Sequence, residues 1–85
     1  MKIGILEIMP VGHFTLVESL LKIFTSVEEN NIFLCVRENG EKNLLPLSNL
    51  FNNQITIIRW DSSSPLKLLF KTLNEYYLDR LYIIN

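Results

Sequence analysis

Short apolar runs that alternate with segments of helical period constrain the fold of this chain more than any other feature. The runs lie at 3–8, 32–36, 54–59 and 81–84, and each has the length of one strand. Strands that alternate with helices imply right-handed crossovers and therefore a parallel sheet.

The first run leads into the clearest predicted helix. Pro10 and Gly12 end the apolar run, and Thr15 followed by Glu18 matches a capping box. The apolar residues after Thr15 recur at steps of three and four, which predicts an amphipathic helix that reaches Val27. They are Leu16, Val17, Leu20, Leu21, Phe24 and Val27.

Two further helices are expected, at 42–51 and from Pro65 to Tyr77. Pro46 cannot occupy a helix interior, so the second helix either starts near Pro46 or has an irregular first turn. The serines at 62–64 supply an N-cap for the third helix and Pro65 its first position. Its apolar stripe consists of Leu66, Leu69, Phe70, Leu73 and Tyr77.

These elements predict one small α/β domain over residues 1–85, a three-layer, Rossmann-like βαβαβαβ half. Its four-stranded parallel sheet should have the order 3-2-1-4. The first two helices should cover one face of the sheet and the third helix the other.

Composition narrows the class of protein. The chain is 48% hydrophobic, which is enough for a core. Its formal net charge of -1 gives no sign of the basic surface that a nucleic-acid-binding protein needs. The single cysteine, Cys35, excludes an internal disulfide and a cysteine-rich metal site, and its place within a strand predicts a buried, inert thiol. No cofactor and no metal are expected.

No signal peptide opens the chain and no apolar segment is long enough to span a bilayer, so the expected compartment is the cytoplasm. The fourth strand is as apolar as the first, yet no helix follows to cover it. Either the chain is a fragment of a larger domain, or this strand pairs with another copy as a homodimer.

Ligands of such sheets bind beyond the carboxyl ends of the strands, where the strand order reverses. Here that point lies between the first and fourth strands, with the 10–14 loop and Asn85 as its walls. His13 is either a hydrogen-bond donor or general base there, or a surface histidine that helps to cap the helix. Gly12 serves either close approach by a ligand or a plain tight turn, and Phe14 either touches ligand or packs against the start of the helix.

Residues on the rim of the same edge have two interpretations each. Asp61 either orients a sugar hydroxyl or begins the serine-rich cap of the third helix. Trp60 is either a stacking platform for a sugar or part of the core, and Arg37 with Glu38 is either a site or a solvated pair. The sequence contains neither a dinucleotide-binding motif nor a P-loop motif. It also shows no Ser-His-Asp order, no pair of catalytic carboxylates and no cluster of metal ligands.

The chain opens with Lys2–Ile8, followed by Pro10-Val-Gly-His-Phe14 and a leucine-rich helix to Phe24. This opening resembles that of glycosyltransferases of the GT-B fold. In those enzymes the first strand runs into a Gly-His or Gly-Gly loop and then a helix. Residues 81–85 also resemble their fourth strand, which ends in a polar residue at the cleft. The resemblance covers the whole chain in layout and about the first 24 residues in motif.

The resemblance implies the front part of the N-terminal, acceptor-binding half of such an enzyme. The acceptor, a sugar or lipid-linked molecule, would contact Gly12, His13, Phe14, Asp61 and Asn85, with His13 as the base. The sugar nucleotide is held mainly by the C-terminal half in this family, so the chain alone should lack transferase activity. Two alternatives are an interaction or dimerisation module without a ligand, and a small phosphate- or nucleotide-binding domain.

Overall fold

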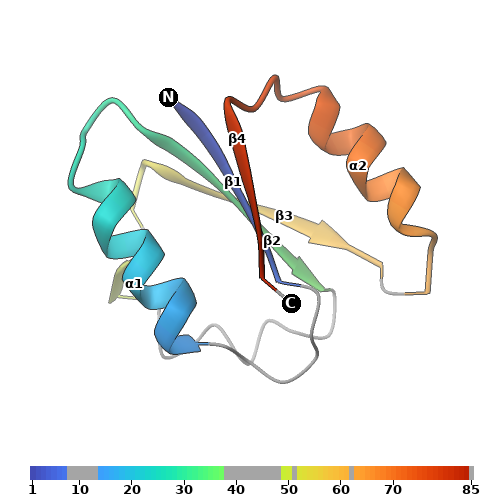
Figure 1. Ribbon diagram of the computed structural model, residues 1–85, viewed down its shortest axis with the longest axis horizontal. Coiled ribbons are helices and arrows are strands. Elements are labelled where there is room, and N and C mark those ends of the chain that lie inside the picture. The colour runs from blue at the N-terminus through green and yellow to red at the C-terminus, as the bar shows by residue number, and fades with distance from the viewer. Residues whose placement is uncertain (8–13, 38–48, 51, 62, 85) are drawn as a thin grey trace.

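The fold is seen in a computed structural model that describes residues 1–7, 14–37, 49–50, 52–61 and 63–84 (Figure 1). Within these residues the chain forms four strands and two α-helices. In chain order the elements are β1 (Lys2–Glu7), α1 (Phe14–Thr25), β2 (Asn31–Arg37), β3 (Ile55–Trp60), α2 (Leu66–Asn74) and β4 (Arg80–Ile84).

The strands form one sheet in which every neighbouring pair is parallel, in the order β3-β2-β1-β4. β1 lies inside the sheet, between β2 and β4. The expected class, strand order and direction are therefore confirmed. The chain runs outward from β1 to β3 and then returns to the other side of β1 as β4 (Figure 1).

Both faces of the sheet carry a hydrophobic core, since the side chains of a strand alternate between faces. α1 covers one face with Val17 and Leu21, which pack on a row of aliphatic side chains from the sheet. We call this cluster the α1-face core; its buried members are Ile5, Val17, Leu21, Ile32, Leu34, Val36 and Ile84.

α2 covers the opposite face with Leu69 and Leu73. We call this second cluster the α2-face core; its buried members are Leu6, Phe33, Cys35, Ile58, Trp60, Leu69 and Leu73. Gly4 also belongs to this face, where Leu78 and Leu81 occupy the space that a Cβ atom would fill, at 2.6 and 2.9 Å. The predicted three-layer arrangement, with the first and third helices on opposite faces, is confirmed (Figure 1).

The second predicted helix, 42–51, lies outside the described residues except for Asn49 and Leu50. These two residues form part of a 3₁₀ turn, and Leu50 packs against the α1-face core. The position of Leu50 agrees with the prediction that this segment covers the same face of the sheet as the first helix.

The predicted helix starts differ from the observed ones by two residues for α1 and by one residue for α2. α1 begins at Phe14, so Thr15 lies inside its first turn, and Glu18 pairs with Lys22 at 2.8 Å instead of reaching back in a capping box. α2 begins at Leu66, with Pro65 as the N-cap and no side-chain hydrogen bond at the cap. Local cap signals place a helix end within a residue or two, and the final boundary depends on packing.

The predicted stripe of α2 is wrong at its last position. The helix ends at Asn74, and Tyr77 then adopts a φ of 54° and is 80% exposed. Tyr76 takes the packing position instead, with its ring 4.9 Å from that of Phe33. The chain turns toward β4 at Tyr77, so the helical period no longer applies there.

The amino edge of the sheet is closed by hydrogen bonds. Asp79 accepts a hydrogen bond from the Lys2 amide at 2.7 Å and donates its own amide to the Lys2 carbonyl at 2.8 Å. The Gln54 side chain donates to the carbonyls of Val27 and Asn30, at 2.8 and 3.2 Å. The amino ends of the strands are thus tied to the adjoining turns by polar contacts.

Candidate functional site

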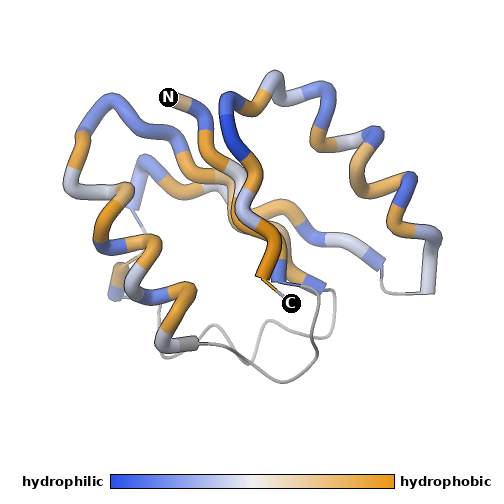
Figure 2. The backbone as a smooth tube through the Cα atoms, in the orientation of Figure 1, coloured by the Kyte–Doolittle hydropathy of each residue, from blue (hydrophilic) through white to orange (hydrophobic). Residues whose placement is uncertain are grey.

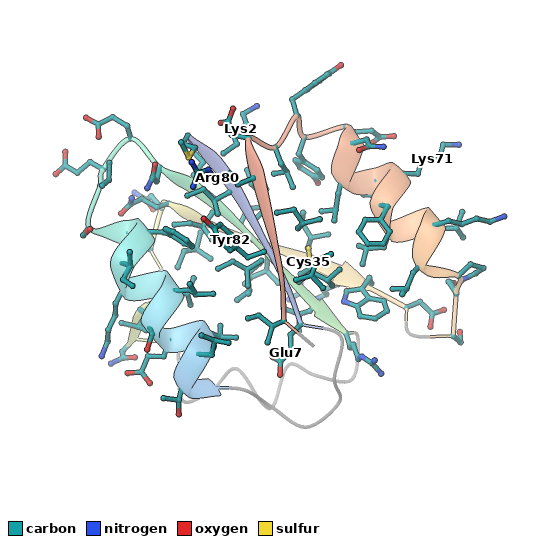
Figure 3. The ribbon with its side chains drawn as sticks, viewed as in Figure 1. Lys2, Glu7, Cys35, Lys71, Arg80 and Tyr82 are labelled. Atoms are coloured by element: carbon teal, nitrogen blue, oxygen red, sulfur yellow. The ribbon has the colours of Figure 1, made fainter. Side chains whose placement is uncertain are left out.

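The carboxyl ends of the strands lie together at the opposite edge of the sheet. Glu7 is in register with Ile84, and Arg37 is in register with Trp60, so the four strands end close to one level. Figure 3 shows Glu7 at this edge, away from Lys2 and Arg80 at the amino edge. Because the strand order reverses between β1 and β4, this edge is where an α/β sheet of this type binds ligands.

Three predicted site residues, Gly12, His13 and Asn85, lie outside the described residues, and so does the side chain of Phe14. The flanking structure is nevertheless clear. β1 ends at Glu7 and α1 begins at Phe14, so the segment with the Gly12–His13 pair starts at the carboxyl end of the central strand. The roles of these four residues in the site remain predictions.

Asp61 follows β3 directly and is held in a local turn. Its Oδ1 accepts hydrogen bonds from the Ser63 amide at 2.9 Å and the Ser63 hydroxyl at 2.7 Å, and its Oδ2 accepts one from the Ser64 hydroxyl at 3.4 Å. The hydrogen bonds from Ser63 lower the pKa of the Asp61 carboxyl. Asp61 therefore organises the turn that leads to α2, but it does not cap the helix, because Pro65 is the N-cap and no side chain bonds the cap.

Asp61 also lies away from the reversal point. β3 is separated from β1 by β2, and two strand spacings amount to about 10 Å. The structure thus places Asp61 on the carboxyl edge but not beside the ends of β1 and β4. A ligand at the reversal point reaches Asp61 only if it extends across the end of β2.

Trp60 is a core residue. It is 8% exposed and packs in the α2-face core, which confirms the core interpretation. The guanidinium carbon of Arg37 lies 5.0 Å from the ring centroid, a cation–π contact that sequence reasoning missed. The two residues are in register on adjacent strands, so the signal becomes visible only once the strand pairing is known.

A shallow pocket of about 190 Å³ lies between the end of β3 and the start of α2. Trp60 and Asp61 line it together with Pro65, Leu68 and Thr72. Its one acidic side chain is already bound by Ser63 and Ser64, and Arg59 lines the pocket as well. It extends the carboxyl edge and lies on the far side of β2 from the reversal point.

The described residues supply little chemistry of their own. Burial raises the pKa of the Cys35 thiol to about 12, which confirms the expectation of an unreactive cysteine. Among the residues that the structure describes, no three His, Cys, Asp or Glu side chains are grouped to hold a metal ion. Glu7 is the acidic residue described at the end of β1 (Figure 3), and the predicted site residue His13 follows it in the chain.

Neither described helix is long and apolar enough to cross a membrane. Comparisons of the chain with protein-family models, with curated proteins and with solved structures found no match. A function can therefore be inferred only from the strand order and from the residues at the carboxyl edge of the sheet.

Proposed function

We propose that this chain is the acceptor-binding, N-terminal part of a glycosyltransferase of the GT-B type, inactive by itself. The observation that supports the proposal is the position of β1, inside a parallel sheet whose order reverses between β1 and β4. Ligands of α/β sheets bind at such a reversal, here beyond the carboxyl end of β1, and the Gly12–His13 pair follows that strand in the chain. A sheet with β1 at its border would have had no reversal there.

The proposed reaction is transfer of a glycosyl group from a nucleotide sugar to a hydroxyl of the acceptor. His13 would accept the proton of that hydroxyl as its oxygen bonds to the anomeric carbon, because an imidazole has a pKa near neutral pH. The bond from that carbon to the phosphate oxygen of the nucleotide would break in the same step, and the nucleotide would leave with its electron pair. Gly12 would let the acceptor approach the backbone closely. In the proposed enzyme a second half holds the nucleotide sugar, so residues 1–85 bind acceptor without transferring sugar.

The geometry revises the role of Asp61 within this proposal. Its carboxylate is anchored by Ser63 and lies about two strand spacings from β1. It would therefore contact only the distal part of an extended acceptor. Asn85, which follows the neighbour of β1, is the closer candidate for a contact at the reversal point.

Nuclear magnetic resonance titration of the 85-residue chain with simple sugars and with glycosides that carry an alkyl chain tests the proposal. We expect amide shifts at the carboxyl edge, at Glu7 and Ile84 and in the 8–13 segment, and none at the amino edge around Asn30 and Asp79. Because the proposed function is acceptor binding, the absence of shifts with every sugar tested would contradict it.

Two variants make the titration specific. His13→Ala should weaken binding at least several-fold if the imidazole contacts the acceptor. Lys71→Ala is the matched control, since Lys71 is an exposed side chain of α2 and lies away from the carboxyl end of β1 (Figure 3). Equal affinities for the two variants would remove His13 from the site.

A further inference from the structure

The outer edge of β4 is the least covered part of the sheet. β4 pairs with β1 on one side, and within the described residues no strand lies on its other side. Ile83, on the α2 side of this strand, is 49% exposed. Figure 2 shows that β4 changes from hydrophilic at its amino end to hydrophobic at its carboxyl end. An apolar strand edge of this kind is a template for pairing with another strand.

The hydrogen bonds of β1 show which backbone groups of β4 face outward. The Asn31 amide donates to the Met1 carbonyl at 2.9 Å, so the odd-numbered residues of β1 bond β2 and the even-numbered ones face β4. Given the register of β1 with β4, Arg80, Tyr82 and Ile84 bond β1. The amide and carbonyl groups of Leu81 and Ile83 therefore point to the outside.

We propose that β4 pairs with β4 of a second copy of this chain, antiparallel, about a two-fold axis that passes beside Tyr82. In this register Leu81 lies opposite Ile83 of the second copy, and each such pair exchanges two hydrogen bonds. All the outward-facing backbone groups of Leu81 and Ile83 are then satisfied. A register centred on either residue alone would leave the other without its partner.

The side chains match in the same register. On the α2 side, the half-exposed Ile83 packs beside Leu81 of the second copy. On the α1 side, the two Tyr82 side chains meet in the pair without hydrogen bonds, where strands place side chains closest together. Each Tyr82 ring is already held by Phe24, at a centroid distance of 5.2 Å.

Charge favours a second copy in the antiparallel orientation. Lys2 and Arg80 lie at the amino edge of the sheet and Glu7 at the carboxyl edge (Figure 3). Antiparallel pairing sets Arg80 opposite Ile84 of the second copy, and Ile84 is in register with Glu7 on the same face. Arg80 of each copy therefore lies on the same face as Glu7 of the other copy, with one strand between them, at two symmetrical places.

The other border of the sheet is less suited to such pairing. The exposed side chains of β3 are Thr56 and Arg59, and a charged residue within an edge strand opposes pairing. β4 is thus the edge that joins the two copies, and the two-fold axis closes the assembly as a dimer.

The α1 flank beside this edge extends the apolar surface. Leu16 and Ile23 are 48% and 61% exposed, and the half-buried Leu20 lies between them on the same side of the helix. Phe24 links α1 to the edge strand through Tyr82. Two copies joined at β4 would bring these flanks toward each other and shield part of this surface.

Sedimentation velocity of the 85-residue chain at high micromolar concentration tests the pairing. We expect a species of twice the 9.9 kDa chain mass, and a monomer for Ile83→Lys. Thr56→Lys adds the same charge to the β3 edge and should leave the dimer intact. A wild-type monomer, or equal dissociation by both variants, would overturn the proposal and leave the edge to a different partner.

Cysteine crosslinking tests the register. In the proposed pair the two residues at position 82 have Cα atoms about 4.5 Å apart, within the range of a disulfide. Tyr82→Cys should therefore give a covalent dimer on mild oxidation. The two residues at position 80 are about 13 Å apart along the strands, so Arg80→Cys should give none. Equal crosslinking at both positions would exclude this register.

The pairing is independent of the acceptor site, which lies at the carboxyl edge. A monomer that binds sugars would contradict the pairing alone, and a dimer that binds none would contradict the proposed function alone. A further strand of a longer chain would compete for the same edge, so the test uses the 85-residue chain itself.

Discussion

Single residues in this protein show where tertiary contacts take precedence over local preference. Tyr77 is held at a φ of 54°, a conformation that costs a residue with a Cβ about 1–2 kcal/mol, while its side chain is 80% exposed. The preceding Tyr76 packs on Phe33, and the chain must turn between this contact and β4. The strain at Tyr77 follows from the fixed positions on either side.

Tyr77→Gly should raise the free energy of unfolding by about 0.5–1 kcal/mol, because glycine adopts positive φ without strain but loses more entropy on folding. Urea denaturation followed by circular dichroism measures the change. Tyr76→Gly is the control and should destabilise the protein, since it removes the ring that contacts Phe33. A loss of stability in Tyr77→Gly would show that the exposed ring has a stabilising contact.

Asp61 makes stability depend on pH. Hydrogen bonds from Ser63 lower its pKa in the folded protein, so the ionised carboxylate is favoured by folding. This contribution is present above the unfolded pKa of about 3.9 and is lost as the pH falls through the lower folded value. Ser63→Ala should therefore reduce stability at pH 7 more than at pH 2, in thermal melts at both values. An equal effect at the two pH values would contradict this role.

At the scale of elements, the two edges of the sheet differ. The amino edge is fixed by hydrogen bonds from Asp79 and Gln54 to neighbouring strands and turns. The carboxyl edge leads into the loops that carry the proposed site. Such a division is typical of α/β proteins, in which one end of the sheet serves stability and the other serves binding.

Asp79→Ala removes the acceptor of the Lys2 amide at the start of β1. We expect a loss of about 1 kcal/mol in the free energy of unfolding, the usual value of one hydrogen bond. Asp79→Asn keeps an acceptor oxygen and should lose less. Urea denaturation of both variants provides the measurement, and an alanine variant as stable as the asparagine variant would contradict the role of this bond.

At the scale of the whole molecule, the sheet joins two cores that lie on opposite faces. α1 covers one and α2 the other, and adjacent residues of each strand contribute to both, as Ile5 and Leu6 do. Loss of packing on one face therefore weakens the strands on which the other face depends. The protein should unfold as one cooperative unit.

Leu21→Ala tests this coupling, because Leu21 is fully buried in the α1-face core. We expect a loss of about 2–5 kcal/mol. Trp60 lies in the α2-face core, so its fluorescence reports on the opposite side of the sheet. The fluorescence and circular dichroism transitions should shift together in urea; separate transitions would show that the two faces unfold independently.

Local pattern determined the class of this protein, and the rules for doubly wound sheets then predicted its strand order. The apolar runs, the helical periods and the turn residues are local signals, and parallel crossovers have one preferred hand, so few arrangements remain. The same patterns placed Cys35 in the core and Asp61 in the serine-rich turn before the third helix. The predicted contacts of Gly12, His13 and Asn85 stay a prediction.

Only the tertiary structure decided features that depend on contacts between distant segments. The exchange of Tyr77 for Tyr76 depends on where Phe33 lies, and the stacking of Arg37 on Trp60 depends on the register of β2 with β3. The outward-facing groups of β4 likewise follow from the hydrogen bonds that β1 makes with β2. Periodicity fixes which side chains share a face, but pairing and register fix which of them meet.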